Sequence, residues 1–595
     1  NRRFHAQPIA CPVCGPQVWY EESGQKLAER EAAIQAARKA LTEGKILAVK
    51  GLGGFHLVCD AQNPQTVEKL RLRKRRSGKP FALMAFDLET IREFSRVSLD
   101  EENLLNSPTA PVVLLETTAA GKELAQLVAP DQNRLGFMLP YTPLHLLLLE
   151  PAEGFPKVLV MTSGNLSEEP IAYSNEDAQS RLSELADGFL LHDRPIHTRI
   201  DDSVISVIEG VPHIQRRARG FAPLPLQIST NAIPTLACGT ELKNTFCLVR
   251  DRYAFVSHHI GDLENQETLT AFEVAVRHYE KIFRIKPQLL AADLHPDYLA
   301  SRYARQRAAE ENLPLVEVQH HHAHIVSCIA DNGLKQHEPV IGLAFDGTGY
   351  GTDGAIWGGE VLLANWEKFE RPFHLEYVRL PGGDAAVRKP ARMALSLILH
   401  AGLDPEGYAF PYHQALSPDE QSAVANQVRT GFNAPKTSSF GRLFDGVAAL
   451  IGLHQQISYE AQNAIALETI ADPNEQSSYD FPIEDGQILI SPVIRAIVHD
   501  LKHKIAPGII SARFHNGLTA CSVRVSERLR SQTGLRQVAL SGGVWQNKTL
   551  TSRTITALSA SGFEVFWPRK LPTNDGGVSL GQALVALAVS KNLKE

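Results

Sequence analysis

The chain has 595 residues, of which 44% are hydrophobic, and a formal net charge of −6 at pH 7. This length suggests roughly four domains, and the composition suits folds that bury large cores. The charge gives no general reason to bind nucleic acid or an acidic membrane, no apolar run is long enough to span a bilayer, and seven scattered cysteines favour a reducing compartment over a disulfide framework. We expect a multidomain cytoplasmic protein with neither nucleic acid nor membrane as a partner.

Residues 1–21 contain a pair of cysteines, Cys11 and Cys14, in the stretch CPVCG. This C-x-x-C spacing can supply two thiolates to a zinc ion. A structural zinc site needs four ligands, and no second C-x-x-C follows in the sequence. We therefore expect either a zinc-finger remnant whose partner ligands lie upstream of residue 1, with His5 as another ligand candidate, or a knuckle that binds nothing in this chain.

From residue 22 to residue 222 the pattern is that of an α/β domain. Residues 27–45 have helical periodicity and end near a glycine, whereas residues 46–61 indicate a strand, a glycine turn and a second strand. Residues 158–172 indicate an apolar strand that runs into a polar turn. The proline-rich stretch 223–234 that follows predicts a linker.

A run of basic residues, LRLRKRRSGK at 70–79, lies within this domain. A charge run is usually a solvated helix face. The acidic total charge and the lack of interleaved aromatic residues weigh against nucleic-acid binding. A phosphate clamp is the functional interpretation, because Lys and Arg offer charge-assisted hydrogen bonds to phosphate oxygens.

The basic run and a later polar turn together carry a family pattern. Lys74 and Arg76, followed by Lys79, and then Ser163 and Asn165 in TSGN, form a K-x-R…S-x-N signature that resembles the YrdC family. The resemblance implies an ATP site that builds a carbamoyl-type adenylate, with these five residues as candidate catalytic groups. The spacing from Arg76 to Lys79 departs from that of free-standing members, which leaves the exact assignments within the run open.

From residue 235 to residue 595 a different pattern appears. In two stretches, 234–263 and 339–369, an apolar strand runs into a turn and another strand leaves it, and LSGGVWQN at 540–547 adds a third turn after an apolar strand. Turns of this kind present backbone N–H groups to phosphates, and glycine permits a close approach. The ordered set predicts a two-lobed actin-like ATPase fold, with lobes at about 235–335 and 336–595.

Four histidines within HHHAH at 320–324 point to a metal. On a helix, His320 and His324 share a face, because positions i and i+4 do, and two imidazoles at this spacing can bind one ion. Satisfied or exposed histidines beside a strand end are the alternative. Asp346 and Asp575, both in Gly turns, are candidates for the remaining ligands. Such a site suits Fe or Zn with open positions.

The H-x-x-x-H, the SGGVWQN turn and the late DGG resemble the TsaD family of threonylcarbamoyl transferases. A zinc motif, a YrdC-like domain and a TsaD-like domain, in that order, resemble the HypF family, and so do the stretches ACPVCGP, LPYTPLH, TSGNLSEEPI and HDRPIHTRIDDSV. The N-terminal acylphosphatase-like domain of that family is absent, which fits a fragment. The implied fold is an α/β multidomain chain: a zinc-finger remnant, a YrdC-like domain and a two-lobed TsaD-like domain.

The HypF resemblance also implies an activity. Carbamate derived from carbamoyl phosphate would be joined to ATP, and the carbamoyl group of the resulting adenylate would pass to the C-terminal cysteine of HypE, for the cyanide ligand of a [NiFe] hydrogenase. The metal at the histidine site would polarise the carbamoyl oxygen. The candidate nucleotide-binding residues are Lys50, Arg219, Lys243, Asn244, Gly347, Gly349, Asp445, Gly542, Gly543 and Asn547.

Three alternatives remain open on the sequence alone. An antibiotic-type O-carbamoyltransferase pairs the same two domains but modifies a small-molecule hydroxyl, and the zinc knuckle weighs weakly against it. Threonylcarbamoylation of tRNA is usually split between chains. A non-catalytic, zinc-anchored nucleic-acid scaffold would require the Gly turns and the H-x-x-x-H to be coincidences.

Overall fold

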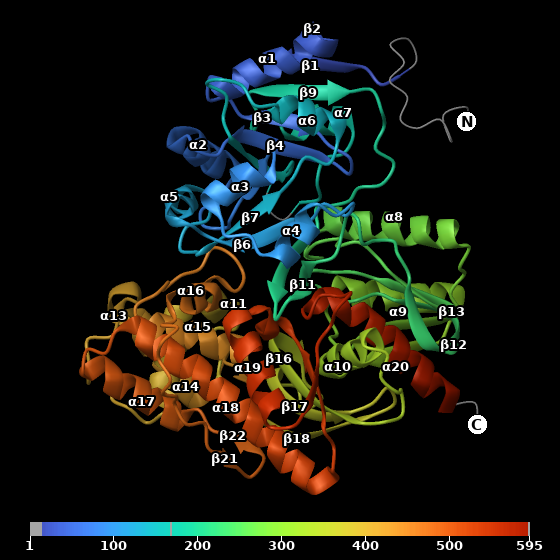
Figure 1. The fold of residues 1–595 in the computed structure, drawn as a ribbon. Coiled ribbons are helices and arrows are strands. Elements are labelled where there is room, and N and C mark those ends of the chain that lie inside the picture. The colour runs from blue at the N-terminus through green and yellow to red at the C-terminus, as the bar shows by residue number, and fades with distance from the viewer. Residues whose placement is uncertain (1–14, 167–168, 593–595) are drawn as a thin grey trace. The chain divides into compact units, whose positions relative to one another are not determined.

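The computed structural model describes residues 15–166 and 169–592. The chain forms two compact units (Figure 1). The first extends to Val207 and includes Ala218–Phe221, and the second comprises Ile208–Arg217 and the chain from Ala222 onward. The Cys11–Cys14 pair lies outside the described residues. No helix within the described ranges has both the length and the apolar character that crossing a membrane requires.

The first unit is built on a twisted mixed sheet. Its strands follow one another across the sheet in the order β10 (Val204–Ile208), β6 (Val112–Glu116), β7 (Arg134–Met138), β5 (Ala82–Ala85), β8 (Val158–Ser163), β4 (Phe55–Asp60), β3 (Leu47–Lys50), β9 (Gly188–His192), β1 (Val18–Glu22) and β2 (Gln25–Glu29). The pairs β10–β6, β5–β7 and β3–β9 are parallel, and the other neighbours run antiparallel.

Helices cover both faces of this sheet because successive strand residues point to opposite sides. Leu57 and Val160 face one core with α2 (Pro64–Lys74), α3 (Leu88–Phe94), α4 (Leu99–Leu105), α5 (Ala119–Val128) and α7 (Asn175–Arg181). Their neighbours Val58 and Leu159 face the other core with α1 (Arg30–Thr42) and α6 (Pro143–Leu149). Several of these helices begin at a side-chain cap, as α2 does at Asn63, which satisfies otherwise unpaired N–H groups.

The second unit repeats one strand plan in two sheets. In the first sheet β12 (Leu226–Ala237) pairs antiparallel with β13 (Cys247–Val256) and parallel with β14 (Leu289–Asp293), which pairs parallel with β15 (Leu315–Val318). In the second, β16 (Val340–Tyr350) pairs antiparallel with β17 (Ile356–Ala364) and parallel with β23 (Gln537–Ser541), which pairs parallel with β24 (Glu564–Phe566). The expected hairpins are therefore present in both halves.

Shorter strands complete the second sheet, and helices fill the outer layers. The strands are β18 (Phe369–Leu375), β19 (Val378–Arg379), β20 (Lys436–Thr437), β21 (Ile483–Glu484) and β22 (Gln487–Ile488). Helices α8 (Gln266–Phe283) and α9 (Leu299–Glu311) pack on the first sheet. The second sheet carries α11 (Asp384–Arg388), α12 (Pro390–His400), α13 (Tyr412–Ala415), α14 (Pro418–Thr430), α15 (Phe440–Leu450), α16 (Gln462–Ile470), α17 (Ser491–Lys502), α18 (Pro507–Thr533) and α19 (Lys548–Ala560).

Two helices lie between the sheets and pack on each other: α10 (His320–Asp331) and α20 (Val578–Asn592). α20 comes last in the chain yet packs against all four strands of the first sheet, whereas α10 packs mainly against β16, β17 and β23 of the second. Their apolar side chains, such as Ile325 and Leu584, share one core. Each of these helices therefore packs mainly against the sheet on the other side of the expected lobe boundary at residue 335.

The stretch expected to be a linker, 223–234, differs in the structure. β12 begins at Leu226 and takes up most of it. Leu226 and Ile228 are buried in the core of the first sheet, and the strand pairs with β13 through register shifts on either side of Ala232. The irregular pairing explains why the sequence shows little strand periodicity here.

Candidate functional site

The histidine helix α10 brings two imidazoles to one point in the second unit. It begins after Gln319, whose side chain accepts a hydrogen bond from the backbone N–H of His322 at 2.9 Å. His320 and His324 are buried, one turn apart, with ring centroids 4.8 Å from each other. Their Nε2 atoms lie 3.2 and 3.1 Å from the same oxygen, Oδ2 of Asp346.

Asp575, at the start of the short 3₁₀ helix η2 (Asp575–Gly577), completes the cluster. Its Oδ1 lies 3.8 Å from Nε2 of His320 and 3.7 Å from Nε2 of His324. One ligand atom from each of the two histidines and two aspartates lies within 4.8 Å of the other three. The structure thus brings together the four side chains that the sequence singled out, and two imidazoles with two carboxylates fit an Fe or Zn ion that keeps open positions.

Burial and neighbouring carboxylates act in opposite directions on these imidazoles. Burial disfavours the charged form of His320, but Asp575 and Asp293 outweigh it and raise the pKa of His320 well above its usual value. Burial likewise disfavours ionisation of Asp346, yet the two histidines hold the pKa of its carboxyl well below its usual range. The carboxylates therefore stabilise positive charge at the two imidazoles, whether it is carried by a proton or by a bound cation.

Asp293 is a residue that the sequence interpretation missed. It ends β14, and its Oδ2 lies 2.8 Å from Nδ1 of His320, on the ring side away from Asp346. A carboxylate in this position fixes the orientation of a metal-binding imidazole. The available signal was the apolar run LLAAD at 289–293, a buried strand that ends in an acid.

The other two histidines of the run have different surroundings. Nε2 of His322 lies 2.7 Å from the carbonyl oxygen of Asn365. Nδ1 of His321 lies 3.3 Å from the side-chain amide of Gln319, and its Nε2 is buried without a hydrogen-bond partner in the described part of the chain. Burial lowers the pKa of both rings. Neither residue belongs to the four-residue cluster.

The Gly turns support the metal cluster directly. The backbone N–H groups of Gly347 and Gly543 donate to Oδ1 of Asp346 at 2.7 and 2.9 Å. Gly542 has φ of +111°, and a Cβ there would lie 2.2 Å from the carbonyl oxygen of Phe345. A Cβ at Gly349 would lie 2.5 Å from the His321 ring. These four candidate nucleotide residues therefore lie around the carboxylate that joins the two histidines.

Lys243 lies at the edge of the same region and forms an ion pair with Glu460. Burial would lower its pKa, but Glu460 and Asp575 outweigh burial and raise the pKa of Lys243. Asp445, on α15, pairs with Arg442 at 3.0 Å, and burial raises the pKa of its carboxyl to about 6.

The two candidate asparagines form hydrogen bonds within their own turns. The Asn244 amide donates to the carbonyl oxygens of Cys238 and Thr240. Asn547 accepts a hydrogen bond from the backbone N–H of Leu550 at the start of α19, and its Nδ2 lies 2.9 Å from Nε2 of His515. Direct nucleotide contacts by these side chains remain predictions.

In the first unit, Lys74 is the last residue of α2 and is buried. Its ammonium donates to the carbonyl oxygens of Ser163 and Asn165 at 2.6 Å and to Oδ1 of Asn165 at 2.8 Å. Burial, with Arg76 as the next cause, lowers the pKa of Lys74 well below its usual value. The Ser163 hydroxyl donates to the same Oδ1 at 2.7 Å. Three of the five candidate catalytic residues thus form one hydrogen-bonded cluster.

Arg76 and Lys79 lie in the loop that follows α2. Nε of Arg76 donates to the carbonyl oxygen of Lys79 at 3.2 Å, and the Arg76 guanidinium lies over the Phe81 ring. Lys79 is exposed. Lys50 is buried on β3, donates to the carbonyl oxygen of His192 at 3.0 Å, and has its pKa lowered by burial.

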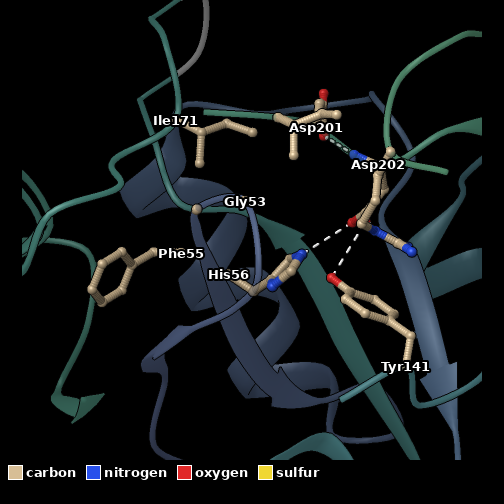
Figure 2. A pocket seen from close by; sticks show the side chains of 10 residues that line it. Gly53, Phe55, His56, Tyr141, Ile171, Asp201 and Asp202 are labelled. Carbon is tan, nitrogen blue, oxygen red and sulfur yellow. Dashed lines mark hydrogen bonds and ion pairs between the residues drawn. The ribbon is translucent and has the colours of Figure 1, made fainter. Parts of the chain in front are cut away.

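A pocket opens beside this cluster (Figure 2). His56 of β4 lies directly opposite Ser163 of β8, and residues so paired share one face of a sheet. Figure 2 shows the side chains of His56 and Tyr141 pointing at Asp202, with Nε2 of His56 3.0 Å from one oxygen of that carboxylate and the Tyr141 hydroxyl 3.4 Å from the other. The pocket therefore borders the candidate catalytic turn.

Arg219 is fully engaged at the same pocket. Its guanidinium donates to Asp202 at 2.9 Å and to the carbonyl oxygens of Thr109 and Ala110, and lies 3.5 Å from the centroid of the Tyr141 ring. Burial opposes the charge on Asp202, but His56 and Arg219 outweigh it and hold the pKa of that carboxyl well below its usual range. Arg219 thus compensates a buried acid, and its contact with a nucleotide remains a prediction.

Comparison with known families adds independent findings. Family models match residues 1–21 (HypF finger), 39–218 (Telomere recombination, the Sua5–YciO–YrdC family), 230–331 (HypF Kae1-like domain) and 342–582 (Carbamoyltransferase, Kae1-like domain, second subdomain). Carbamoyltransferase HypF of Synechocystis is 42% identical over 96% of this chain and 75% of its own length. Its counterpart in Rhodobacter capsulatus is 42% identical over 99% and 77%.

The chain belongs to the HypF carbamoyltransferase family. Two solved HypF structures cover 100% of it. The full-length protein in its phosphate- and nucleotide-bound form has a TM-score of 0.92, 43% identity and 76% of its own chain covered, and the T. kodakarensis protein has 0.90, 35% and 78%. The predicted family and fold class, with a YrdC-like domain, Kae1-like domains and a HypF finger at the N-terminus, are confirmed.

Proposed function

We propose that this HypF family member forms carbamoyl-adenylate from ATP and carbamate derived from carbamoyl phosphate, and transfers the carbamoyl group to the C-terminal cysteine of HypE. The product would serve the synthesis of the cyanide ligand of a [NiFe] hydrogenase. The observation that carries the proposal is the occurrence, in one chain of a carbamoyltransferase family, of a basic Lys74 cluster and a separate His–Asp metal cluster.

The first step belongs to the Lys74 cluster. A carbamate oxygen attacks the α-phosphorus of ATP, and pyrophosphate leaves. Lys74, Arg76 and Lys79 place positive charge near the turn where negative charge grows in the transition state. Ser163 and Asn165 supply hydrogen-bonding groups, and the Lys74 ammonium holds both of their carbonyl groups. The pocket beside Ser163 is lined by Asp201, Asp202 and Arg219, of which Asp202 and Arg219 form an ion pair.

The second step belongs to the metal cluster. The HypE thiolate attacks the carbamoyl carbon, a carbon–sulfur bond forms, the bond from that carbon to the phosphate oxygen breaks, and AMP leaves. His320, His324, Asp346 and Asp575 would hold Fe or Zn, which as a Lewis acid supplies polarisation of the carbamoyl oxygen. Lys243, close enough to Asp575 for that carboxylate to raise its pKa, is placed to neutralise the phosphate that leaves. Cys11 and Cys14 would bind structural zinc together with further ligands.

ATP–pyrophosphate exchange that requires carbamate tests the first step. The double variant Ser163→Ala/Asn165→Ala should lose at least 100-fold of the exchange rate, on the scale at which oxyanion-type donors act. Ser183→Ala, an exposed serine of the same unit, is the control and should keep it. Mass spectrometry of HypE after incubation with ATP and carbamate tests the whole proposal. Exchange that survives in the double variant, or HypE without added carbamoyl mass, would refute it.

A further inference from the structure

A carboxylate that the proposed mechanism leaves unused lies beside the metal cluster. Glu460 precedes α16 and forms an ion pair with Lys243, which lies in the turn between β12 and β13. The two residues come from different strand-and-helix layers of the second unit: Lys243 from the first sheet, Glu460 from the helices on the second. Asp575 acts electrostatically on Lys243, which makes this lysine a candidate cation for a phosphate bound beside the cluster.

The Lys243 turn is held in a specific shape. Lys243 has φ of +46°, a left-handed conformation that costs free energy for a residue with a side chain. Its backbone N–H donates to Oδ1 of Asp262 at 2.7 Å, and the carbonyl oxygen of Lys243 lies 3.7 Å from where a Cβ of Gly576 would be. The turn therefore fixes the lysine beside the loop that carries Asp575.

The Lys243–Glu460 pair is accessible to solvent and replaceable. The side chain of Lys243 is 28% exposed and that of Glu460 is 51% exposed. Exposed ion pairs contribute little to stability because water screens them and two long side chains must be ordered. A phosphate group offers the same lysine more negative charge and more acceptor oxygens than a carboxylate does.

Glu460 also adds charge where acids already gather. Asp346 repels its carboxylate and Arg442 attracts it, and Lys243 is its ion-pair partner. A nucleotide phosphate that takes Lys243 would leave Glu460 without this ion-pair partner and still repelled by Asp346. The carboxylate therefore opposes phosphate binding both by competition and by repulsion.

We propose that Glu460 occupies the phosphate subsite of the second unit in the absence of ligand, as a stand-in anion on Lys243, and so limits how tightly that unit binds a nucleoside monophosphate. This inference rests on the proposed function, since it takes an adenylate as the ligand. It assigns Glu460 a role in affinity: AMP, the product that must leave, is released more readily because Glu460 reclaims the lysine.

Binding of AMP and of adenosine, measured by calorimetry, tests the proposal. The background is the full chain with Ser163→Ala/Asn165→Ala, which removes the candidate site of the first unit. Glu460→Gln should tighten AMP binding by roughly fivefold, the scale of one exposed ion pair, and should leave adenosine, which has no phosphate, unchanged. Lys243→Met should weaken AMP and not adenosine. Glu484→Gln, an exposed acid of the same unit, is the control.

The outcomes separate this inference from the proposed function. Unchanged or weaker AMP binding in Glu460→Gln overturns the stand-in role, and weaker binding would make Glu460 an orienting group for Lys243. Tighter binding of adenosine as well would show a general loosening of the site and also overturn it. If the protein with an intact Lys243 binds neither ligand, the proposed transfer site itself fails.

Discussion

At the residue scale, the metal cluster depends on one carboxylate shared by two imidazoles. Both His320 and His324 direct Nε2 at Oδ2 of Asp346, and the other oxygen of that carboxylate is held by backbone N–H groups. All of these groups are buried or nearly so. A buried arrangement of this kind stays ordered only while every charge has its partner.

Removal of single histidines from α10 should divide them into two classes. His320→Ala or His324→Ala should each reduce bound metal at least tenfold, because either change removes one of two nitrogen ligands. His322→Ala should keep the metal, since its Nε2 faces the Asn365 carbonyl. Metal content by plasma emission measures this. An empty site in His322→Ala with a full one in His320→Ala would refute the i, i+4 assignment.

Asp293 should tune the same site through His320. Asp293→Asn keeps the shape but removes the charge next to Nδ1 of His320, and we expect metal affinity to fall roughly 10- to 100-fold, as is usual when an outer partner of a metal-binding histidine is lost. Competition with a chelator measures the affinity. Asp297→Asn, an exposed acid on the loop after β14, is the control. Equal affinities in Asp293→Asn and the native protein would make Asp293 a packing residue only.

At the element scale, the turn after β23 shows why glycine is required at a defined position. Gly542 has φ of +111° and ψ of 158°, a region that only glycine adopts readily. Its neighbour Gly543 then directs a backbone N–H at Asp346. The turn thus connects the backbone of β23 to a candidate metal ligand on β16.

Gly542→Ala should lower the free energy of unfolding by about 2 kcal/mol or more, because it adds backbone strain and a Cβ within 2.2 Å of the Phe345 carbonyl oxygen. Gly347→Ala is the matched control, since the nearest atom to its Cβ, from Arg442, lies 3.9 Å away; its cost should stay below roughly 1 kcal/mol. Urea unfolding followed by tryptophan fluorescence compares the two. Equal midpoints would contradict the steric argument.

These elements also show how far the sequence could lead. The spacing of His320 and His324 and the acids in Gly turns predicted a cluster that the structure brings together, because helix periodicity and strand-end turns are local properties. Asp293 could not be found this way, since only the tertiary fold brings the end of β14 to α10. The packing of α20 on the first sheet, which brings the two ends of the second unit together, also depends on the tertiary fold and could not be predicted from local sequence patterns.

At the scale of the whole molecule, the two units carry different chemistry. The first holds Lys74, Ser163 and Asn165 in one hydrogen-bonded turn and contains no carboxylate–histidine metal cluster among its described residues. The second holds the metal cluster and Lys243. In the proposed function an intermediate is made in one unit and used in the other, and this would explain why both units are on one chain, since carbamate and its adenylate decay in water.

The last prediction follows from this division. Asp575→Asn removes one negative oxygen ligand from the second unit and should reduce bound metal and carbamoyl transfer to HypE by at least tenfold, while carbamate-dependent ATP–pyrophosphate exchange stays within about twofold of the native rate. Ser163→Ala/Asn165→Ala should show the reverse: full metal content, no exchange, and transfer restored when carbamoyl-adenylate is supplied. Exchange, metal content and the mass of HypE are measured on the same preparations. If the Asp575→Asn variant folds fully but loses exchange, both steps share one composite site, because residues of independent sites should not affect each other's reaction.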